Sequence, residues 1–306
     1  MGNPITSADW LRLLDTRFNK VDKDVFAGLP SMLDKFFTVL PSDSAFEEFY
    51  EAGSLPDIVP FTGKLEYLHF VPEYYRKIEP SEWAAGIQYE RKLLDDEKYG
   101  IMMGGEAQLA ESAQRVREKE GVKVWTEAFS NAYSYMSSEE GLSLCNSSHT
   151  TKSGVSTSTG FDNSGTSAAS KTAVTAARLA MKRFKNNIGE RITVNPDTIV
   201  CPTALVDTFE ELNQTQNGYN SAEGTKNMQA GRWNVIGYDL LDDNSTKNWF
   251  MVDSKMMKRF LVWIDRVKPE FNSIPDFETF MLKRSVYTRI GWGVLNWRWV
   301  YGHLVS

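Results

Sequence analysis

The aromatic C-terminal end, residues 276 to 306, constrains this chain more than any other part of it. Three tryptophans and a tyrosine fall within ten residues there, at Trp292, Trp297, Trp299 and Tyr301, among glycines and an arginine. Such side chains are unfavourable in water and need a partner surface. Because chain ends usually fray, this one must be docked. It is either a buried strand of its own domain or a strand that completes a sheet at a contact between subunits, and both alternatives are open.

The composition is that of an ordinary soluble globular chain, long enough for one large domain or two modest ones. Of the 306 residues, 42% are hydrophobic and 24% are charged. Lysine and arginine total 34 against 40 for aspartate and glutamate, which gives a net charge of −6. This acidic balance argues against a protein that grips nucleic acid through its phosphates.

The cysteines and histidines show no spacing that is typical of a metal or cofactor site. Cys145 and Cys201 lie outside any CxxC pattern, and His69, His149 and His303 have no second ligand at helical or turn spacing. We therefore expect no metal and no cofactor. No apolar run approaches the roughly 18 residues that span a bilayer, and no charged-then-apolar leader begins the chain. These patterns predict a soluble protein of a reducing cytoplasm, without a membrane partner.

Two patterns that come near catalytic motifs are better explained as structure. Residues 165 to 172 differ by one residue from a phosphate-binding loop, but Ser170 replaces the second glycine and no buried strand precedes it. This segment is interpreted as a capped helix start. No Gly-x-Ser-x-Gly elbow is present, so we expect no enzymatic activity. A hydrolase with a dispersed Ser/His/Asp site, built on His149 or His303, is a less favoured alternative.

Two segments near the N-terminus carry apolar side chains that lack an obvious partner. Residues 7 to 21 place Trp10 and Phe18 on one helical stripe, which predicts an N-terminal arm rather than a core element. Residues 61 to 88 alternate aromatic and polar side chains, which predicts a long exposed hairpin-like excursion. Aromatic residues on a projecting loop are unfavourable in a monomer, so they indicate a surface that another chain supplies.

The remaining periodicities predict an α+β fold without a regular βαβ repeat. The clearest helix is expected over residues 105 to 136, and a second helical unit follows the polar loop at 146 to 167. Strands are expected at residues 198–201, 234–241, 248–252, 259–266 and from 277 onward.

In order and spacing, three stretches resemble the major capsid proteins of tailed phages, which have the Hong Kong 97 fold, and above all the Mu-like major head subunit group. The first is YERKLLDDEKYG at residues 89 to 100, and the second is NPDTIVCPTAL at 195 to 205. The third comprises RSVYTRIGWG at 284 to 293 and WRWVYG at 297 to 302. The likeness covers residues 49 to 303.

This resemblance implies a shell subunit with an N-terminal arm, an extended loop, a long spine helix, a peripheral domain and an axial domain. The implied boundaries are 1–55 for the arm, 56–90 for the extended loop, 91–164 and 251–306 for the peripheral domain with its spine helix at 105–137, and 165–250 for the axial domain. The contacts expected between subunits are Trp10, Phe18, Tyr67, Phe70, Tyr74, Tyr75, Trp83, Arg91, Trp297 and Trp299.

The implied function is structural. Many copies would assemble through hexamers and pentamers into the icosahedral head of a virion, in the cytoplasm of a bacterial host, and enclose double-stranded DNA without sequence-specific binding. Further expected partners are a scaffolding protein and a portal protein, with a maturation protease and decoration proteins as additional candidates. Because no long charged helical extension precedes the arm, we expect a separate scaffold or prior cleavage. The alternative of the same fold is an encapsulin-like compartment that encloses protein cargo.

Overall fold

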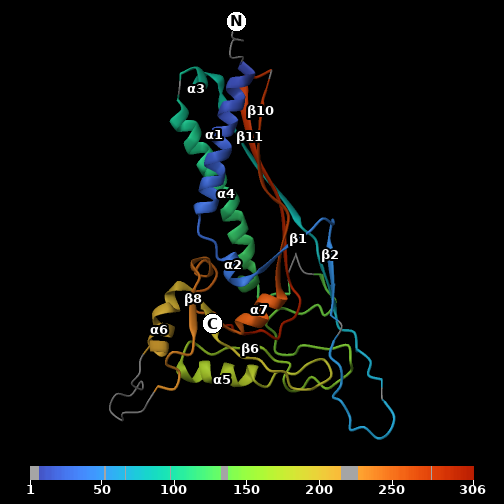
Figure 1. Ribbon diagram of the computed structural model, residues 1–306. Helices are drawn as coiled ribbons and strands as arrows, with labels where there is room; N and C mark the ends of the chain where they lie inside the picture. Colours follow the sequence, from blue (N-terminus) through green and yellow to red (C-terminus); the bar gives the residue numbers. More distant parts are fainter. Residues whose placement is uncertain are drawn as a thin grey trace.

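The computed structural model describes residues 7–51, 53–65, 67–96, 98–131, 137–214, 227–276 and 278–306, and it mixes helices with three β-sheets (Figure 1). This arrangement confirms the predicted α+β class. Side chains are described from residue 16 onward, so the prediction for Trp10 concerns a side chain outside the described part. Residues 132 to 136 of the predicted long helix also lie outside it.

The longest sheet has four strands in the order β1-β10-β11-β4. Its strands are β1 (Thr38–Pro41), β4 (Ser81–Glu90), β10 (Leu261–Pro275) and β11 (Met281–Val294). The two long strands, β10 and β11, form an antiparallel hairpin in which Trp263 pairs with Trp292. Strand β1 runs parallel to β10 at one edge, and β4 runs antiparallel to β11 at the other.

The long helix α4 (Tyr99–Thr126) and the N-terminal helix α1 (Ser7–Gly28) lie side by side along this sheet (Figure 1). Helix α4 begins six residues before the predicted start and ends at Thr126, where residues 127–129 form a turn, so the prediction that it continues to 136 is wrong. It passes Gly121 as one continuous helix, and a Cβ at this position would lie 2.1 Å from Cδ2 of Leu33. The glycine therefore lets the segment after α1 approach the helix closely.

Helix α1 is part of the subunit core, which corrects the prediction of an arm outside it. Phe18 is 1% exposed and packs with Tyr89, Met102 and Leu282. Buried charges also bind α1 to the other elements, because Arg284 on β11 contacts Asp22 on α1 and donates to Glu106 on α4 at 2.9 Å. The side chains of all three charged residues are fully buried. Charges taken out of water need such partners, so α1 is held firmly.

The second sheet has five strands in the order β6-β12-β9-β7-β8. Its strands are β6 (Ser164–Gly165), β7 (Thr198–Cys201), β8 (Asn234–Gly237), β9 (Trp249–Val252) and β12 (Val300–His303). Helix α5 (Lys171–Met181) packs against β9 and β12, and helix α6 (Val206–Gln214) packs against β8. Oγ of Ser170 accepts a hydrogen bond from the backbone N–H of Ala173 at 3.2 Å, which confirms the predicted capped helix start.

The remaining elements are short. They are the helices α2 (Leu33–Phe36), α3 (Arg91–Asp95) and α7 (Ser254–Phe260), the 3-10 helices η1 (Thr203–Leu205) and η3 (Asp239–Leu241), and the strands β2 (Glu47–Tyr50), β3 (Tyr75–Ile78) and β5 (Ser137–Ser138) of a three-stranded sheet. The predicted strand at 198–201 matches β7 residue for residue, whereas the strand predicted from 259 begins at Leu261, because α7 occupies the two residues before it.

The aromatic C-terminal end is a buried part of its own subunit. Strand β12 pairs antiparallel with β9, and Trp299 is fully buried. The rings of Trp299 and Trp125 meet edge to face at 5.7 Å, and Trp125 also contacts Phe250 at 5.2 Å. Trp297 is 4% exposed and packs against Phe184 at 5.2 Å. Of the two alternatives that the sequence leaves open, the buried strand is therefore the one observed.

Candidate functional site: the extended loop and its base

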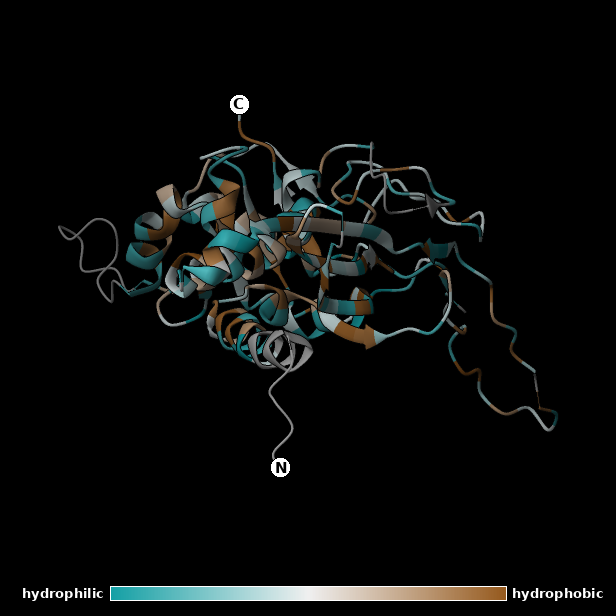
Figure 2. Cartoon of the chain, turned by 90° about the horizontal axis from the view of Figure 1, so that it is seen from above, coloured by the Kyte–Doolittle hydropathy of each residue, from teal (hydrophilic) through white to brown (hydrophobic). Residues whose placement is uncertain are grey.

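A long loop projects from the body of the subunit between two paired strands. Strands β2 and β3 pair antiparallel, with Tyr50 opposite Tyr75, and residues 51–74 connect them. The described residues of this connection form neither helix nor strand. In Figure 1 the loop leaves the subunit at the lower right, and Figure 2 shows the same projection from above, with hydrophobic residues in brown along it. The predicted excursion is thus present, although residues 81–90 belong to strand β4.

The loop exposes an unusual amount of apolar side chain. Ile58 is 92% exposed, Tyr67 83% and Phe61 73%. Four more large hydrophobic residues of the loop are also exposed, namely Leu55, Val59, Leu65 and Phe70. We name these seven residues the loop patch. Apolar groups gathered on one projecting segment mark an interaction surface, because isolated soluble subunits seldom expose so many together.

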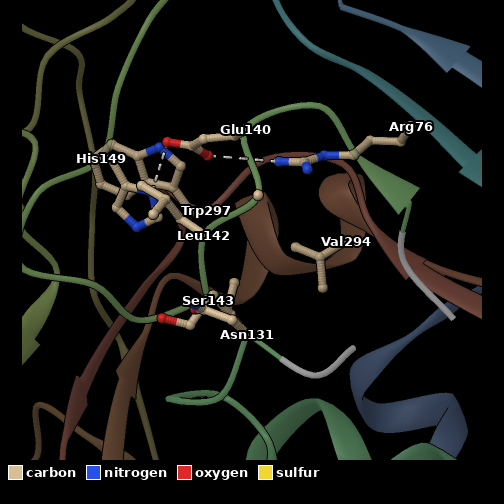
Figure 3. A pocket seen from close by; sticks show the side chains of 10 residues that line it. Arg76, Asn131, Glu140, Leu142, Ser143, His149, Val294 and Trp297 are labelled. Atoms are coloured by element: carbon tan, nitrogen blue, oxygen red, sulfur yellow. Dashed lines mark hydrogen bonds and ion pairs between the residues drawn. The ribbon is translucent and has the colours of Figure 1, made fainter. Parts of the chain in front are cut away.

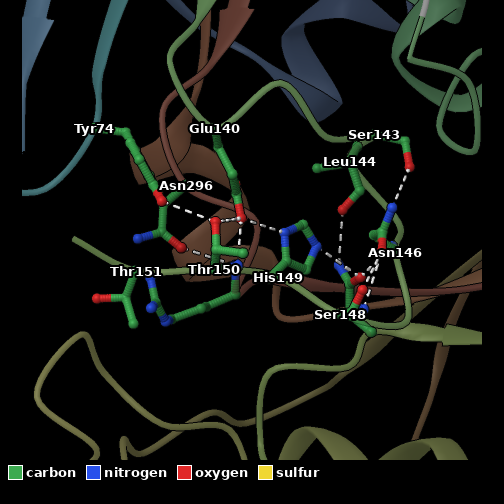
Figure 4. A network of polar contacts seen from close by, with 12 residues as sticks. Tyr74, Glu140, Ser143, Leu144, Asn146, Ser148, His149, Thr150, Thr151 and Asn296 are labelled. Carbon is green, nitrogen blue, oxygen red and sulfur yellow. Dashed lines mark hydrogen bonds and ion pairs between the residues drawn. The ribbon is translucent and has the colours of Figure 1, made fainter. Parts of the chain in front are cut away.

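A polar network around the buried His149 contacts the root of the loop, where the Tyr74 hydroxyl meets Thr150 (Figure 4). Nδ1 of His149 is 3.1 Å from Oε1 of Glu140, and Nε2 is 3.1 Å from Oδ1 of Asn163. Nδ2 of Asn163 donates to the carbonyl oxygens of Leu144 and Val300, which fixes its Oδ1 as an acceptor. The histidine therefore joins the loop after β5 to the segment before β6.

Trp297 closes this network on one side. Its ring stacks on the ring of His149 at 4.2 Å with an interplanar angle of 4°. Figure 3 shows the two rings face to face, with Glu140 between His149 and Arg76. The cavity beside them has a volume of only about 50 Å³ and includes Leu142 and Val294 in its lining. A space of this size holds only a few water molecules, so this cavity is too small for a substrate and the His149 contacts support the fold.

Burial shifts the ionisation of the charged groups around the network. Burial raises the pKa of Glu51, and the neighbouring Arg298 opposes that change. Burial also lowers the pKa of both Arg76 and Arg298. For Glu140 burial acts to raise the pKa, but the hydrogen bond from His149 and the other nearby donors outweigh it and lower the pKa overall. For Glu51, Arg76 and Arg298, burial thus disfavours the charged form more than the neighbouring opposite charges favour it, whereas at Glu140 the neighbours outweigh burial.

Four of the predicted contact residues lie on the loop or at its root. Tyr67 and Phe70 belong to the exposed loop patch. Tyr74 and Tyr75 are half-buried at the root, where the Tyr74 hydroxyl is 2.8 Å from Oγ1 of Thr150 and the Tyr75 ring stacks on Tyr50 at 6.0 Å. The structure thus brings these four residues together on one segment and its root.

The other predicted contact residues are distributed over the subunit. Arg91 is exposed on α3, where it forms an ion pair with Asp95 at 3.6 Å, and Trp83 is half-buried on β4. The predictions for Phe18, Trp297 and Trp299 are corrected, since all three are enclosed in the subunit core. Their side chains already have packing partners within the subunit, so they present no surface to a neighbour.

Sequence reasoning missed the first half of the loop patch. Ile58 and Phe61 are among its most exposed residues, and both lie within the extended loop predicted at 56–90, yet neither is among the predicted contacts. The available signal was the pair Pro56 and Pro60, which flank short apolar runs and lack the N–H groups that a sheet requires. Apolar residues that cannot join a sheet and cannot form a helix are candidates for a surface contact.

The structure does not assemble the dispersed catalytic site that was left open. His149 has a carboxylate on one nitrogen, but an asparagine and not a serine on the other. Nδ1 of His303 accepts from the backbone N–H of Ser167 at 3.2 Å. Across the described ranges, no group of three or more histidine, cysteine or acidic residues could hold a metal ion. Cys145 and Cys201 are both buried as free thiols.

Several solved capsid structures share this architecture. The chain is similar to the subunit in the procapsid of bacteriophage JBD30, with 14% identity over 99% of this chain and 77% of that chain and a TM-score of 0.53. It is also similar to the capsid subunit of a native GTA particle, at 13% identity, 91% of each chain and a TM-score of 0.53. For the capsid of cyanophage P-SCSP1u the values are 12%, 90% and 88%, and 0.56. The fold is therefore that of the Hong Kong 97 capsid shell proteins.

The sequence comparison makes the assignment specific. A family model described as "Phage capsid protein" matches residues 74–302, most of the chain, and the chain thus belongs to the phage capsid protein family. No curated protein matches it. The chain is a shell protein of the virion capsid, a structural role and not an enzymatic one, and the encapsulin-like alternative is not favoured. Within the described ranges, no helix is both long enough and apolar enough to cross a bilayer.

Proposed function

We propose that this chain is the repeating subunit of an icosahedral phage head, assembled through hexamers and pentamers around double-stranded DNA. The observation that carries the proposal is the loop patch, which projects from an otherwise well-packed subunit. In a ring of identical copies, each loop covers the neighbour and each body receives a loop. Such a contact between two different faces closes a ring when the rotation between copies closes. Permanent contacts typically bury about 2,000 Å² or more, which a long loop helps to supply.

The proposed domain boundaries follow the sheets. The loop is taken as residues 51–74, because β3 and β4 are sheet strands. The axial domain is taken as residues 165–250 together with β12, since β12 pairs with β9 and β6 in the five-stranded sheet. The peripheral domain then combines α4 with the hairpin of β10 and β11. Helix α1 joins it, because Arg284 and Phe18 anchor this helix.

The proposed partners follow from the role of a head subunit. They are further copies of the chain, a scaffolding protein, a portal protein, a maturation protease and decoration proteins. A capsid of bacteriophage JBD30, whose subunit is similar to this chain, is decorated with minor capsid protein trimers. The net charge of −6 suits a container that confines DNA without gripping its phosphates. Within the family, we assign the chain to the Mu-like major head subunit group, on the strength of the three stretches described above.

Replacing apolar residues of the loop patch tests the proposal directly. The variant with Ile58→Ser, Phe61→Ser and Tyr67→Ser is expected to fold like the wild type, because these side chains have few packing partners within the subunit. Its assembly should fail, since the apolar contact with the neighbour is removed. Purified protein is examined by negative-stain electron microscopy, first alone and then with a candidate scaffold, and shells or capsomer rings are counted.

The matched control is Lys64→Ser, which changes an exposed polar residue of the same loop. It should assemble at the wild-type yield. Normal shells from the triple variant, or a persistent compact monomer from the wild type under all conditions, would contradict the proposal. DNA rather than protein cargo inside particles from the natural source would separate a phage head from an encapsulin-like compartment.

A further inference from the structure

One buried amide side chain holds both ends of the extended loop. Asn187 is 2% exposed, and its Oδ1 accepts a hydrogen bond from the backbone N–H of Ser54 at 2.9 Å. Its Nδ2 donates to the carbonyl oxygen of Val71 at 3.1 Å. Ser54 lies where the loop leaves β2 and Val71 where it returns to β3, so one side chain bridges the outgoing and the incoming ends.

The backbone at this bridge accepts only a very small residue. Gly53 has a φ of +72°, in the left-handed region. A Cβ at this position would lie 2.0 Å from the carbonyl oxygen of Val71 and 2.5 Å from Nδ2 of Asn187. A non-glycine residue would be strained by the backbone conformation and would displace the amide that it touches. The two loop ends and Asn187 therefore fit together as one unit, which we name the loop clamp.

The residue that bridges the loop is itself anchored. Asn187 lies in a tight turn in which the N–H of Asn186 donates to the carbonyl of Glu190 at 2.8 Å. Nε of Arg298, which is buried in the C-terminal segment, donates to the carbonyl of Lys185 at 2.6 Å. The Ser153 hydroxyl donates to the carbonyl of Asn187. The turn is thus fixed to the body of the subunit, and the loop is fixed to the turn.

The loop ends are also bound to each other. The N–H of Glu73 donates to the carbonyl of Glu51 at 3.0 Å. The Thr151 hydroxyl lies 2.8 Å from Oε1 of Glu73 and 3.2 Å from the carbonyl oxygen of Asn187. Beyond these contacts the described loop residues form no helix or strand. The direction in which the loop leaves the subunit is therefore decided at the clamp and not along the loop.

We propose that Asn187 is a positioning residue for assembly, which aims the extended loop at the neighbouring copy by holding Ser54 N and Val71 O at one fixed separation. This inference rests on the proposed function, in which the loop covers a neighbour. The role requires an amide, because one atom must accept and the other must donate. An aspartate at this position would keep the acceptor for Ser54 but place an oxygen against the carbonyl of Val71.

Hydrogen exchange and assembly of the full-length chain test the role together. In Asn187→Ala, the N–H groups of Ser54 and Glu73 should exchange at least about tenfold faster than in the wild type, because the hydrogen bonds from Asn187 that hold the two loop ends together are lost. Exchange in β7, β9 and β10 should be unchanged. Electron microscopy should show a several-fold lower yield of shells, or shells of irregular diameter. Asn195→Ala, which removes an exposed amide of the same segment, is the matched control and should match the wild type in both measurements.

Two results would overturn the inference. One is unchanged exchange at Ser54 in Asn187→Ala, and the other is faster exchange with shells of normal yield and diameter. If Asn187→Ala fails to fold, Gly53→Ala decides instead, because it strains the same clamp from the loop side. Failure of the proposed function itself is recognised separately, because either the wild type would then form no shells or the triple variant of the loop patch would assemble normally.

Discussion

The C-terminal end and the extended loop are both rich in large apolar side chains, but those of the C-terminal end are buried and those of the loop are exposed to water. Trp297 and Trp299 are buried at 4% and 0% exposure, whereas Ile58 and Tyr67 are exposed at 92% and 83%. The C-terminal end pairs with β9 and reaches the core, while the described residues of the loop belong to no strand. A high density of aromatic residues thus shows that a surface must be covered. It does not show whether the same chain or another one covers it.

Glycines in the C-terminal end and prolines in the loop distinguish the two segments. A Cβ at Gly302 would lie 2.6 Å from Sγ of Cys145, and one at Gly293 would lie 2.5 Å from Cδ1 of Ile78. Glycines next to the tryptophans therefore mark places where other side chains approach the backbone. The loop instead has Pro56 and Pro60 between its apolar residues, and these remove backbone donors. Glycines that other side chains contact accompany burial here, whereas Gly63 of the loop has nothing within 4 Å of a Cβ position and the loop's prolines accompany projection.

The largest effect on the free energy of unfolding is expected from a substitution in the buried C-terminal end. Trp299→Ala should lower the free energy of unfolding by about 3 to 5 kcal/mol, because it leaves a cavity beside Trp125. The measurement is urea unfolding of the unassembled subunit, followed by tryptophan fluorescence and circular dichroism. Trp299→Phe, which keeps a ring in the cavity, should lose clearly less. A loss below about 1 kcal/mol for the alanine variant would show that the C-terminal end is not an integral part of the core.

A somewhat smaller effect is expected from acid. Burial lowers the pKa of His303 to about 4 from its ordinary value of 6.5, and the ring stacks on Trp249 at 4.0 Å while its Nδ1 accepts from Ser167. Between these two pH values the unfolded chain binds a proton that the folded chain does not. The free energy of unfolding should therefore fall by about 2 to 3 kcal/mol as the pH drops from about 6.5 to 4.

Other groups titrate in the same range, so the test of His303 is a difference between two proteins. His303→Asn removes the titrating ring and keeps an acceptor near Ser167. Unfolding is followed from pH 7 to pH 4 for both proteins, and the wild type should lose more stability than the variant by the amount given above. Parallel pH profiles would indicate that the C-terminal end is open to water, which would weaken the contrast with the loop.

The smallest effect is expected on the exposed side. Ile58→Ser alone should change the free energy of unfolding of the subunit by no more than about 0.5 kcal/mol, because the side chain is almost fully exposed. Thermal and urea unfolding of the unassembled subunit measure this. A loss of 2 kcal/mol or more would mean that the loop folds back onto its own subunit in solution, and the comparison between the two regions would then fail.

Local patterns in the sequence predicted what depends on neighbours along the chain. The strand at 198–201, the cap at Ser170 and the projecting excursion all follow from short segments, and all are present. The start of the long helix was predicted at Gly105 rather than Tyr99. A glycine inside a helix costs about 1 kcal/mol, but a Cβ at Gly105 would lie 2.2 Å from the Tyr89 hydroxyl oxygen, so tertiary packing requires glycine there.

Contacts between distant residues could not be predicted in the same way. Asp22 and Arg284 are separated by 262 positions, so nothing near Asp22 indicates that its helix is anchored in the core. Asn187 likewise carries no local signal, because its role depends on Ser54 and Val71, which lie 133 and 116 positions away. For the candidate site, the sequence indicated part of the exposed patch, Tyr67 and Phe70, but not what holds the loop in place.

The buried charges of Arg284, Asp22 and Glu106 have a consequence for how the subunit can be observed. Sliding α1 along α4 by even one helical turn would pull these charges apart in a place without water, and an unpaired buried charge costs several kcal/mol. We therefore expect the two helices and the hairpin of β10 and β11 to move together as one rigid unit. In low-resolution images of a particle, the tilt of α4 alone would report the orientation of this half of each subunit.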